Sequence, residues 1–265
     1  DETTVNVLDV EKSTCYMWVY GCGLEQSTGP KLVLFDYQDS RSSIHPTDFL
    51  AGFSGYLQVD GYAGYEKTRA TLVGCWAHAR RKFHELHVTE QSLISIEALE
   101  LFQTLYAVER EIDEQFERNQ TPMPRDAQIV RQIRQNKAKP VADRLLAWLQ
   151  EKRLGTTKNA SITKAIEYCL KRWQALTRYL DDGNLPIDNN WAENQMRPWA
   201  LGRKNWLFAG SLKSGQRAAV IMSLIQSARL NGLDVYAYLS DVLKRLPTHK
   251  DKDIDELLPH VWKLQ

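Results

Sequence analysis

Three acidic residues stand where local sequence patterns suit a catalytic metal site. Asp1 precedes a stretch rich in threonine and valine, Asp60 ends a short apolar stretch before Gly61, and Glu193 lies in a stretch with a helical pattern. Two-metal phosphoryl transfer needs several carboxylates, from different elements, converging on ions about 3.5–4 Å apart. Active sites of α/β domains gather at the carboxyl ends of strands. The positions of these residues therefore fit metal-assisted phosphoryl transfer.

Each of the two later carboxylates also has a structural explanation. Asp60 before Gly61 is a common way to start a turn. Asn190 followed three residues later by Glu193 is a capping-box arrangement, and Arg197 can pair with Glu193 one helical turn further on. On spacing alone these structural roles are favoured over catalysis.

Two basic regions suit contact with nucleic-acid phosphates. The first is the triplet Arg80-Arg81-Lys82; the second, residues 197–217, contains no acidic residue and interleaves cations with aromatic side chains. Such a mixture favours the nucleic-acid backbone and unstacked bases, although solvated cations beside core aromatics would give the same pattern. The residues of the second region are Arg197, Arg203, Lys204, Lys213 and Arg217, with Trp199, Trp206 and Phe208.

A zinc site is a further hypothesis for residues 75–87. Cys75 and His78 have a spacing that places both on one helix face, and His84 and His87 follow. No second ligand pair has the usual spacing, and Cys75 also belongs to an apolar stripe of this helix. A core role is therefore favoured for Cys75.

The elements that must position these residues change character along the chain. Strands are predicted at residues 3–10, 14–20, 31–37, 56–60 and 71–74, with a short helix before the fourth strand and a helix at 75–87 after the fifth. The first three strands follow one another quickly, which indicates an antiparallel meander. This order is that of a ribonuclease-H-like α/β domain, although several mixed sheets would produce it.

From residue 91 the apolar period becomes helical. Helices are predicted at 94–116, 127–136, 141–152 and 161–180, with a break at 121–124. Further helices are expected from Asn190 to just before Pro198, at 214–230 and at 234–246, followed by a tail at 248–265. The chain is therefore expected to contain an all-helical block within an α/β domain.

Composition excludes few classes of protein. The 265 residues carry a formal net charge of +1, and no stretch approaches the ~20 apolar residues that span a bilayer. The four cysteines are scattered, which favours a reducing cytoplasmic setting over a disulfide framework. The first residue is Asp1, and a strand pattern starts at once, so we expect a piece of a longer polypeptide.

Several stretches together resemble the insertion sequence 66 family of DDE transposases, in the family's order and over nearly the whole chain. They are Asp1-Glu2-Thr3, residues 16–20 (YMWVY), 55–62 (GYLQVDGY), 74–83 (GCWAHARRKF), 188–190 (DNN) with Ala192-Glu193, Arg197-Pro198, 202–208 (GRKNWLF), 231–233 (NGL) and 236–239 (YAYL). This resemblance outweighs the structural explanations of Asp60 and Glu193.

The resemblance implies that Asp1, Asp60 and Glu193 are the catalytic carboxylates and hold two divalent metal ions, Mg²⁺ or Mn²⁺. It implies a ribonuclease-H-like mixed sheet at residues 1–90 and 186–247, with a helical insertion at 91–185 between the second and third carboxylates and a tail at 248–265. One departure is Asn194, where the family often has arginine after the glutamate.

DNA is the implied substrate and partner, at transposon ends and target, in a bacterial, nucleoid-associated setting. DNA contacts would come from Arg80, Arg81, Lys82, Arg197, Arg203 and Lys204. A homodimer or larger assembly is expected, with accessory proteins of the same element as further partners and no membrane association. The family's upstream DNA-binding regions are absent from this sequence, so recognition of specific ends is expected to be impaired.

Two alternative functions stay open at this point. One is a metal-dependent nuclease of the same fold, such as a ribonuclease H or a junction resolvase, which would hydrolyse DNA or RNA without joining strands. The other is a non-catalytic DNA-binding or assembly domain in which the carboxylates are structural.

Overall fold

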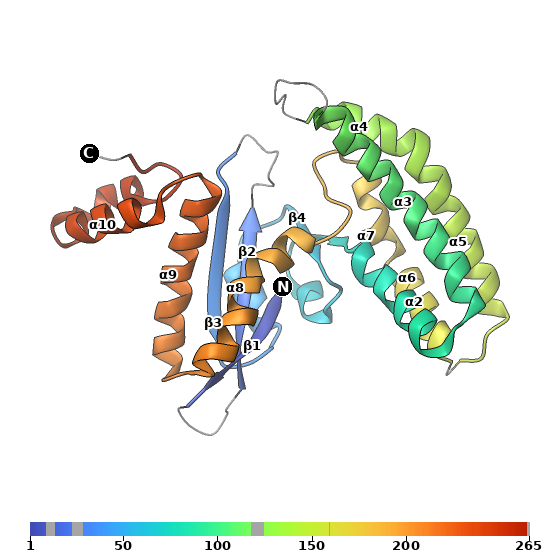
Figure 1. The fold of residues 1–265 in the computed structure, drawn as a ribbon, viewed down its shortest axis with the longest axis horizontal. Helices are drawn as coiled ribbons and strands as arrows, with labels where there is room; N and C mark the ends of the chain where they lie inside the picture. The colour runs from blue at the N-terminus through green and yellow to red at the C-terminus, as the bar shows by residue number, and fades with distance from the viewer. Residues whose placement is uncertain (9–13, 23–28, 118–124, 159, 264–265) are drawn as a thin grey trace. The chain divides into compact units, whose positions relative to one another are not determined.

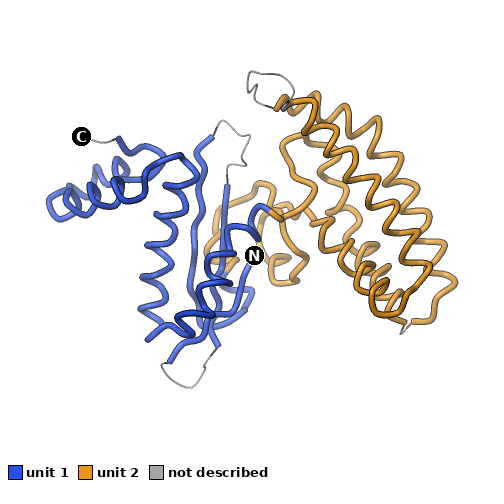
Figure 2. Tube along the Cα trace, viewed as in Figure 1, with its two compact units in different colours: residues 1–45, 191–265 blue, residues 46–190 orange. Residues whose placement is uncertain are grey.

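The chain forms two compact units in a computed structural model that describes residues 1–8, 14–22, 29–117, 125–158 and 160–263. Unit 1 comprises residues 1–45 and 191–265, and unit 2 comprises residues 46–190 (Figure 2). The predicted end of the first strand at residues 9–10 and the predicted break at 121–124 lie outside the described residues.

Unit 1 is built on a four-stranded mixed sheet of order β3-β2-β1-β6. Strands β1 (Glu2–Val7), β2 (Thr14–Cys22) and β3 (Leu32–Gln38) form the predicted antiparallel meander. The two-residue strand β6 (Phe208–Ala209), which the sequence did not predict, pairs in parallel with β1. The mixed α/β class is thereby confirmed, whereas the ribonuclease-H-like arrangement stays a prediction.

Helices α8 (Asn190–Trp206) and α9 (Leu212–Leu230) pack against this sheet and form the core of unit 1 with it (Figure 1). Met17 and Val19 of the central strand β2 are buried in one cluster with Trp199 of α8 and Ala219 of α9. Burial of this apolar surface is the main stabilising contribution.

Helix α9 also completes the hydrogen bonding of the strand at the sheet edge. Ser223 Oγ accepts from the Phe35 N–H (2.8 Å), and Ser227 Oγ accepts from the Val33 N–H (3.0 Å) and donates to the Val33 carbonyl (3.1 Å). These bonds satisfy backbone groups that an edge strand would otherwise present for pairing with another chain.

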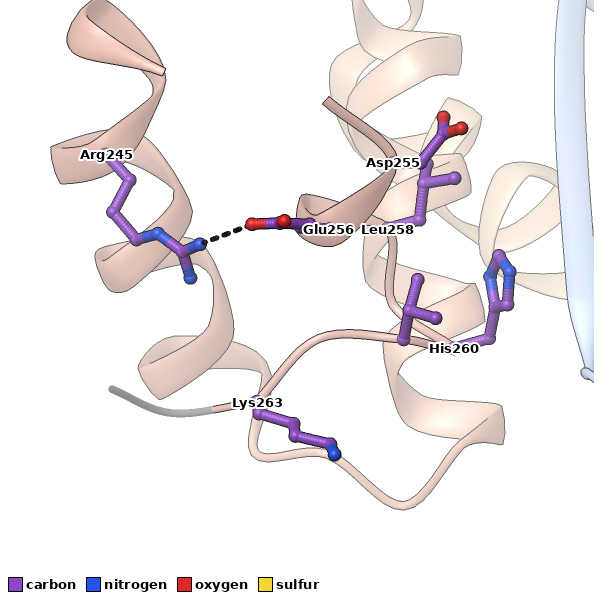
Figure 3. Close-up of a pocket in the computed structure, with 7 residues that line it drawn as sticks. Arg245, Asp255, Glu256, Leu258, His260 and Lys263 are labelled. Atoms are coloured by element: carbon purple, nitrogen blue, oxygen red, sulfur yellow. Dashed lines mark ion pairs between the residues drawn. The ribbon is translucent and has the colours of Figure 1, made fainter. Parts of the chain in front are cut away.

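The C-terminal part of unit 1 is folded beyond the last predicted helix. Helix α10 (Val235–Arg245) is followed by the 3-10 helices η4 (Leu246–Thr248) and η5 (Asp251–Leu257). Tyr238 is fully buried and its hydroxyl donates to the Leu257 carbonyl (2.9 Å). An open pocket beside these elements has charged side chains of both signs in its lining, with Arg245 3.9 Å from Glu256 (Figure 3).

Unit 2 begins within helix α1 (Ile44–Phe49) and contains a parallel two-stranded sheet of β4 (Tyr56–Val59) and β5 (Thr71–Gly74). The 3-10 helix η1 (Ala63–Lys67) connects the two strands. Both strands lie close to their predicted positions. Because parallel strands point the same way, Asp60 and Cys75 follow the same end of this sheet.

The rest of unit 2 is helical. Its helices pack around one buried cluster of apolar side chains, which includes Trp76, Phe83, Phe102 and Leu145. The helices are α2 (Trp76–Glu90), α3 (Leu93–Glu117), α4 (Ala127–Ile133), the π-helix η2 (Arg134–Ala138), α5 (Lys139–Leu154), α6 (Ser161–Lys171), α7 (Trp173–Thr177) and the 3-10 helix η3 (Arg178–Leu180).

A buried ion pair links the helices of this unit to the chain that leaves them. Arg134 donates to both carboxylate oxygens of Glu109 (2.8 and 2.7 Å) and to the carbonyls of Tyr179, Asp182 and Leu185. A buried guanidinium requires such full pairing, because an unpaired buried charge is strongly destabilising.

Two predicted helix boundaries were wrong. Helix α8 continues through Pro198 to Trp206, although proline removes one backbone hydrogen bond, and buried Met196 and Trp199 on either side of it provide compensating packing. The predicted helix 161–180 is interrupted at Arg172, whose φ and ψ of −108° and 10° end α6.

Candidate active site

Asp60 follows β4 directly and is half-buried in a hydrogen-bonded turn. Its Oδ1 accepts from the Tyr62 N–H (2.8 Å), the typical bond of an aspartate that starts a turn. Among the described residues, the second carboxylate oxygen has no hydrogen-bond donor. Gly61 follows with φ of +97°, a value that side-chain-bearing residues rarely adopt. The turn thus leaves one oxygen of Asp60 available to a ligand.

Tyr168 of helix α6 and Arg172, the residue that follows this helix, contact the turn. The Tyr168 hydroxyl donates to the Asp60 carbonyl (2.6 Å), and Arg172 Nη2 donates to the Gly61 carbonyl (2.9 Å). Neither residue was predicted from the sequence to belong to the site, and their spacing of four within a predicted helix was the available signal.

Two cationic side chains lie close to the Tyr168 ring. Arg172 Cζ lies 4.4 Å and Lys82 Nζ 4.6 Å from its centroid. Burial raises the pKa of Tyr168 to about 12; the Arg172 charge opposes this shift, and the Asp60 charge adds to it. The hydroxyl therefore stays protonated at neutral pH and can donate its hydrogen bond.

Asp1 and Glu193 belong to unit 1. Asp1 is half-buried before β1; its carbonyl accepts from the Val19 N–H (2.8 Å), and its Oδ1 accepts from the Glu2 N–H (2.8 Å). Glu193 is half-buried in the first turn of α8. Since Asp60 belongs to unit 2, the assembly of the three carboxylates into one site stays a prediction. Within either unit, the described residues include no cluster of three metal-ligating side chains.

Helix α8 begins on a polar network within unit 2. Asp188 accepts from the Asn190 N–H (3.1 Å) and from the Tyr106 hydroxyl (2.9 Å). The Asn189 N–H donates to the Cys75 sulfur (3.4 Å). Asp188, for which the sequence predicted no role, stabilises the start of the helix that carries Glu193.

Cys75 is a core residue. It is 1% exposed, and burial raises the pKa of its thiol to about 11, so the protonated form prevails at neutral pH. Its buried sulfur also accepts from the Asn189 N–H, so these surroundings favour packing, and the zinc hypothesis stays a prediction.

The predicted DNA-contacting residues differ in exposure. Arg80, Arg81, Arg197 and Lys204 are exposed, whereas Lys82 is half-buried on the Tyr168 ring. Their DNA contacts stay predictions.

Arg203 donates hydrogen bonds within unit 1. Its Nη1 donates to Thr3 Oγ1 (2.9 Å) and to both the carbonyl (2.7 Å) and Oγ1 (2.9 Å) of Thr4. These bonds connect α8 to β1, the strand that Asp1 precedes.

The aromatic side chains of the second basic region divide between core and surface. Trp199 is 3% exposed, whereas Trp206 and Phe208 are 42% and 41% exposed. Exposed aromatic rings beside Lys204 are suited to stacking with bases.

Comparison with known proteins decides the family. A family model described as Transposase IS66 family matches residues 1–217, and a second, the IS66 C-terminal element, matches residues 223–260. The chain belongs to the IS66 transposase family. This confirms the resemblance inferred from the motifs.

The chain spans about half the length of the curated relatives it matches. Two of them, from Sinorhizobium fredii, carry the names uncharacterized protein y4hP and uncharacterized protein y4jD. The first is 35% identical over 286 aligned residues, covering 99% of this chain and 50% of the relative. The second is 35% identical over 280 residues, covering 99% of this chain and 53% of the relative. No solved structure matches significantly.

In the described parts of this IS66-family chain, every helix is too short or too polar to cross a bilayer.

Proposed function

We propose that this chain is the catalytic part of a DNA transposase, in which Asp1, Asp60 and Glu193 hold two Mg²⁺ or Mn²⁺ ions. Membership of the IS66 transposase family supports a role in transposition. The geometry of Asp60 carries the catalytic part of the proposal, because its carboxylate follows a parallel strand in a constrained turn. Carboxylate oxygens are the ligands that Mg²⁺ prefers.

When bound, the ions would activate the attacking water or DNA 3′-hydroxyl and stabilise the leaving 3′ oxygen. Asp60 would present one carboxylate oxygen while Tyr62 holds the other. Asp1 would contribute from the start of β1, and Glu193 from the first turn of α8. Such in-line transfer depends on positioning and charge neutralisation more than on a covalent protein intermediate.

The proposal includes a ribonuclease-H-like catalytic region. The antiparallel meander β1-β2-β3 after Asp1 and the parallel strand β4 before Asp60 support it. The long helical segment between Asp60 and Glu193 supports its assignment as an insertion.

DNA would be held by exposed cations. Arg80 and Arg81 on α2 and Arg197 and Lys204 on α8 would contact phosphates, and Trp206 would stack on an unpaired base. Lys82, Arg203 and Arg81 also have partners within the protein, namely the Tyr168 ring, Thr3 and His78, so contact with DNA would compete with these interactions. Joining two transposon ends would require at least a dimer, and accessory proteins of the element are further proposed partners in the nucleoid.

Nicking of supercoiled plasmid DNA in Mn²⁺ tests the proposal. The Asp60→Ala variant should lose nicking while keeping its DNA affinity, and Asp143→Ala, which changes an exposed carboxylate of α5, should behave like the parent. Equal loss of nicking and DNA affinity in Asp60→Ala would contradict the catalytic role.

Strand joining separates transposition from hydrolysis. The parent chain should join a labelled DNA 3′-hydroxyl end to the plasmid. Nicking without joining would favour a nuclease, and metal-independent DNA binding without nicking would favour a non-catalytic domain.

A further inference from the structure

Helix α6 reaches the Asp60 turn from a position more than 100 residues further along the chain. The bond from Tyr168 to the Asp60 carbonyl and the bond from Arg172 to the Gly61 carbonyl satisfy two consecutive backbone acceptors. The guanidinium bond carries charge assistance, which strengthens it. Because one carbonyl belongs to the Asp60–Gly61 peptide and the other to the Gly61–Tyr62 peptide, the two donors restrict both peptide groups that flank the Gly61 Cα.

The lack of a side chain at Gly61 permits this close approach. A Cβ atom there would lie 2.7 Å from the Tyr168 hydroxyl and 2.8 Å from Arg172 Nε. The positive φ of Gly61 is a second, independent reason for glycine. The backbone turn and the side chains of Tyr168 and Arg172 are therefore fitted to each other.

The cations around Tyr168 give the contact a defined orientation. Lys82 of α2 and Arg172 both lie over the Tyr168 ring, and cation–π attraction to these two side chains restrains the ring. Each partner of Tyr168 thus limits the directions in which its hydroxyl can point.

We propose that Tyr168 and Arg172 are positioning residues that fix the carboxylate of Asp60 for metal binding. They act on the backbone of the Asp60 turn and not on the metal or DNA. The inference rests on the proposed function of Asp60 and gives the helical segment a role in the same site. Groups that orient a metal ligand typically affect metal affinity by roughly 10- to 100-fold when removed.

Calorimetric titration of the whole chain with Mn²⁺ tests this role through a matched pair of variants. Tyr168→Phe removes a hydroxyl bonded to the Asp60 carbonyl; Tyr238→Phe removes a buried hydroxyl bonded to the Leu257 carbonyl, in unit 1. Tyr168→Phe should weaken Mn²⁺ affinity by roughly tenfold, the low end for such groups, and Tyr238→Phe should leave it unchanged. Thermal unfolding of both variants shows whether their stabilities are comparable.

A second pair of variants, at Arg172 and Arg178, tests the positioning role without relying on Tyr168→Phe. Arg172→Met removes the donor to Gly61, and Arg178→Met removes a donor to the Leu72 carbonyl of β5. Arg172→Met should weaken Mn²⁺ binding and Arg172→Lys should restore part of it, whereas Arg178→Met should lower stability alone.

Asp60→Ala separates failure of the inference from failure of the proposed function. If Asp60→Ala loses Mn²⁺ binding but Tyr168→Phe and Arg172→Met bind as their controls do, the positioning role is wrong and the metal site stands. If Asp60→Ala binds Mn²⁺ as the parent does, Asp60 is not a ligand and both proposals fail.

Discussion

The turn at Asp60 and the strand after Asp1 present their carboxylates by different means. In unit 2, Tyr168 of the distant helix α6 and Arg172, which follows that helix, bind the peptide carbonyls on the two sides of the Gly61 Cα. In unit 1, Asp1 is held by the strand ladder, through the Val19 N–H. A ladder bond survives most side-chain substitutions, since it joins backbone groups, whereas the Asp60 turn depends on particular side chains. The Asp60 turn should therefore be the more sensitive of the two regions to mutation.

The substitution Gly61→Ala should have the largest effect. It introduces a Cβ against Tyr168 and Arg172 at a positive φ, and should abolish Mn²⁺ binding and destabilise unit 2 by more than the ~1–2 kcal/mol of left-handed backbone strain alone. Gly52→Ala is the matched control, because Gly52 has φ of +85° but open space around it. Thermal unfolding and calorimetry measure both effects. Equal losses in the two variants would show that contact with α6 is unimportant.

Substitution of Arg203 tests how far the strand after Asp1, in unit 1, also depends on a side chain. Arg203→Met removes three hydrogen bonds to Thr3 and Thr4, and should lower the free energy of unfolding by about 1.5–3 kcal/mol. Arg197→Met, on the same helix but exposed, should change it little. Urea unfolding distinguishes the two, and an equally stable Arg203→Met would show that the link between α8 and β1 is dispensable.

Exposed cations should affect DNA binding without affecting either region's stability. Replacing Lys204 with alanine should weaken binding to DNA of any sequence and reduce the slope of log affinity against log salt by about 1. Titration of labelled DNA at several salt concentrations measures this slope. An unchanged slope would remove Lys204 from the phosphate contacts.

The smallest expected effect is a change in the alkaline stability of the Asp60 region. The pKa of Tyr168 is raised to about 12 in the folded chain, from an ordinary value of 10.0. The neutral form is thus favoured by folding; this stabilisation is complete below pH 10 and is lost as the pH rises to 12. Tyr168→Phe should lose less stability than the parent over this interval. Parallel pH dependences of the two unfolding curves would contradict the proposed burial of the hydroxyl.

The sequence predicted elements with strong local patterns and missed those that depend on distant partners. Strands β4 and β5 and the long helix α3 have clear periodicity and lie close to their predicted positions. Strand β6 has two residues and exists because it pairs with β1. Leu207, with φ of +68°, ends α8 before it, and a leucine gives no local signal for that conformation.

For the candidate site, the sequence predicted single residues but not their contacts. A strand pattern before Asp60 and a glycine after it, together with the family motifs, led to the prediction of Asp60, and the family motifs led to Asp1 and Glu193; their assembly into one site stays a prediction. Tyr168 could not be assigned to Asp60, because their contact spans 108 residues of sequence. Arg203 was expected to face DNA, but its bonds to β1 depend on tertiary packing that charge pattern does not reveal.

Calorimetric titration of Asp60→Asn and Glu193→Gln with Mn²⁺ tests whether these two residues serve one metal site. Both substitutions remove a negative charge with little change of shape. If the two residues serve one metal site, each variant should lose most of the parent's Mn²⁺ affinity although they belong to different units. If both variants bind Mn²⁺ as the parent does, the shared metal site is wrong and the two carboxylates have structural roles.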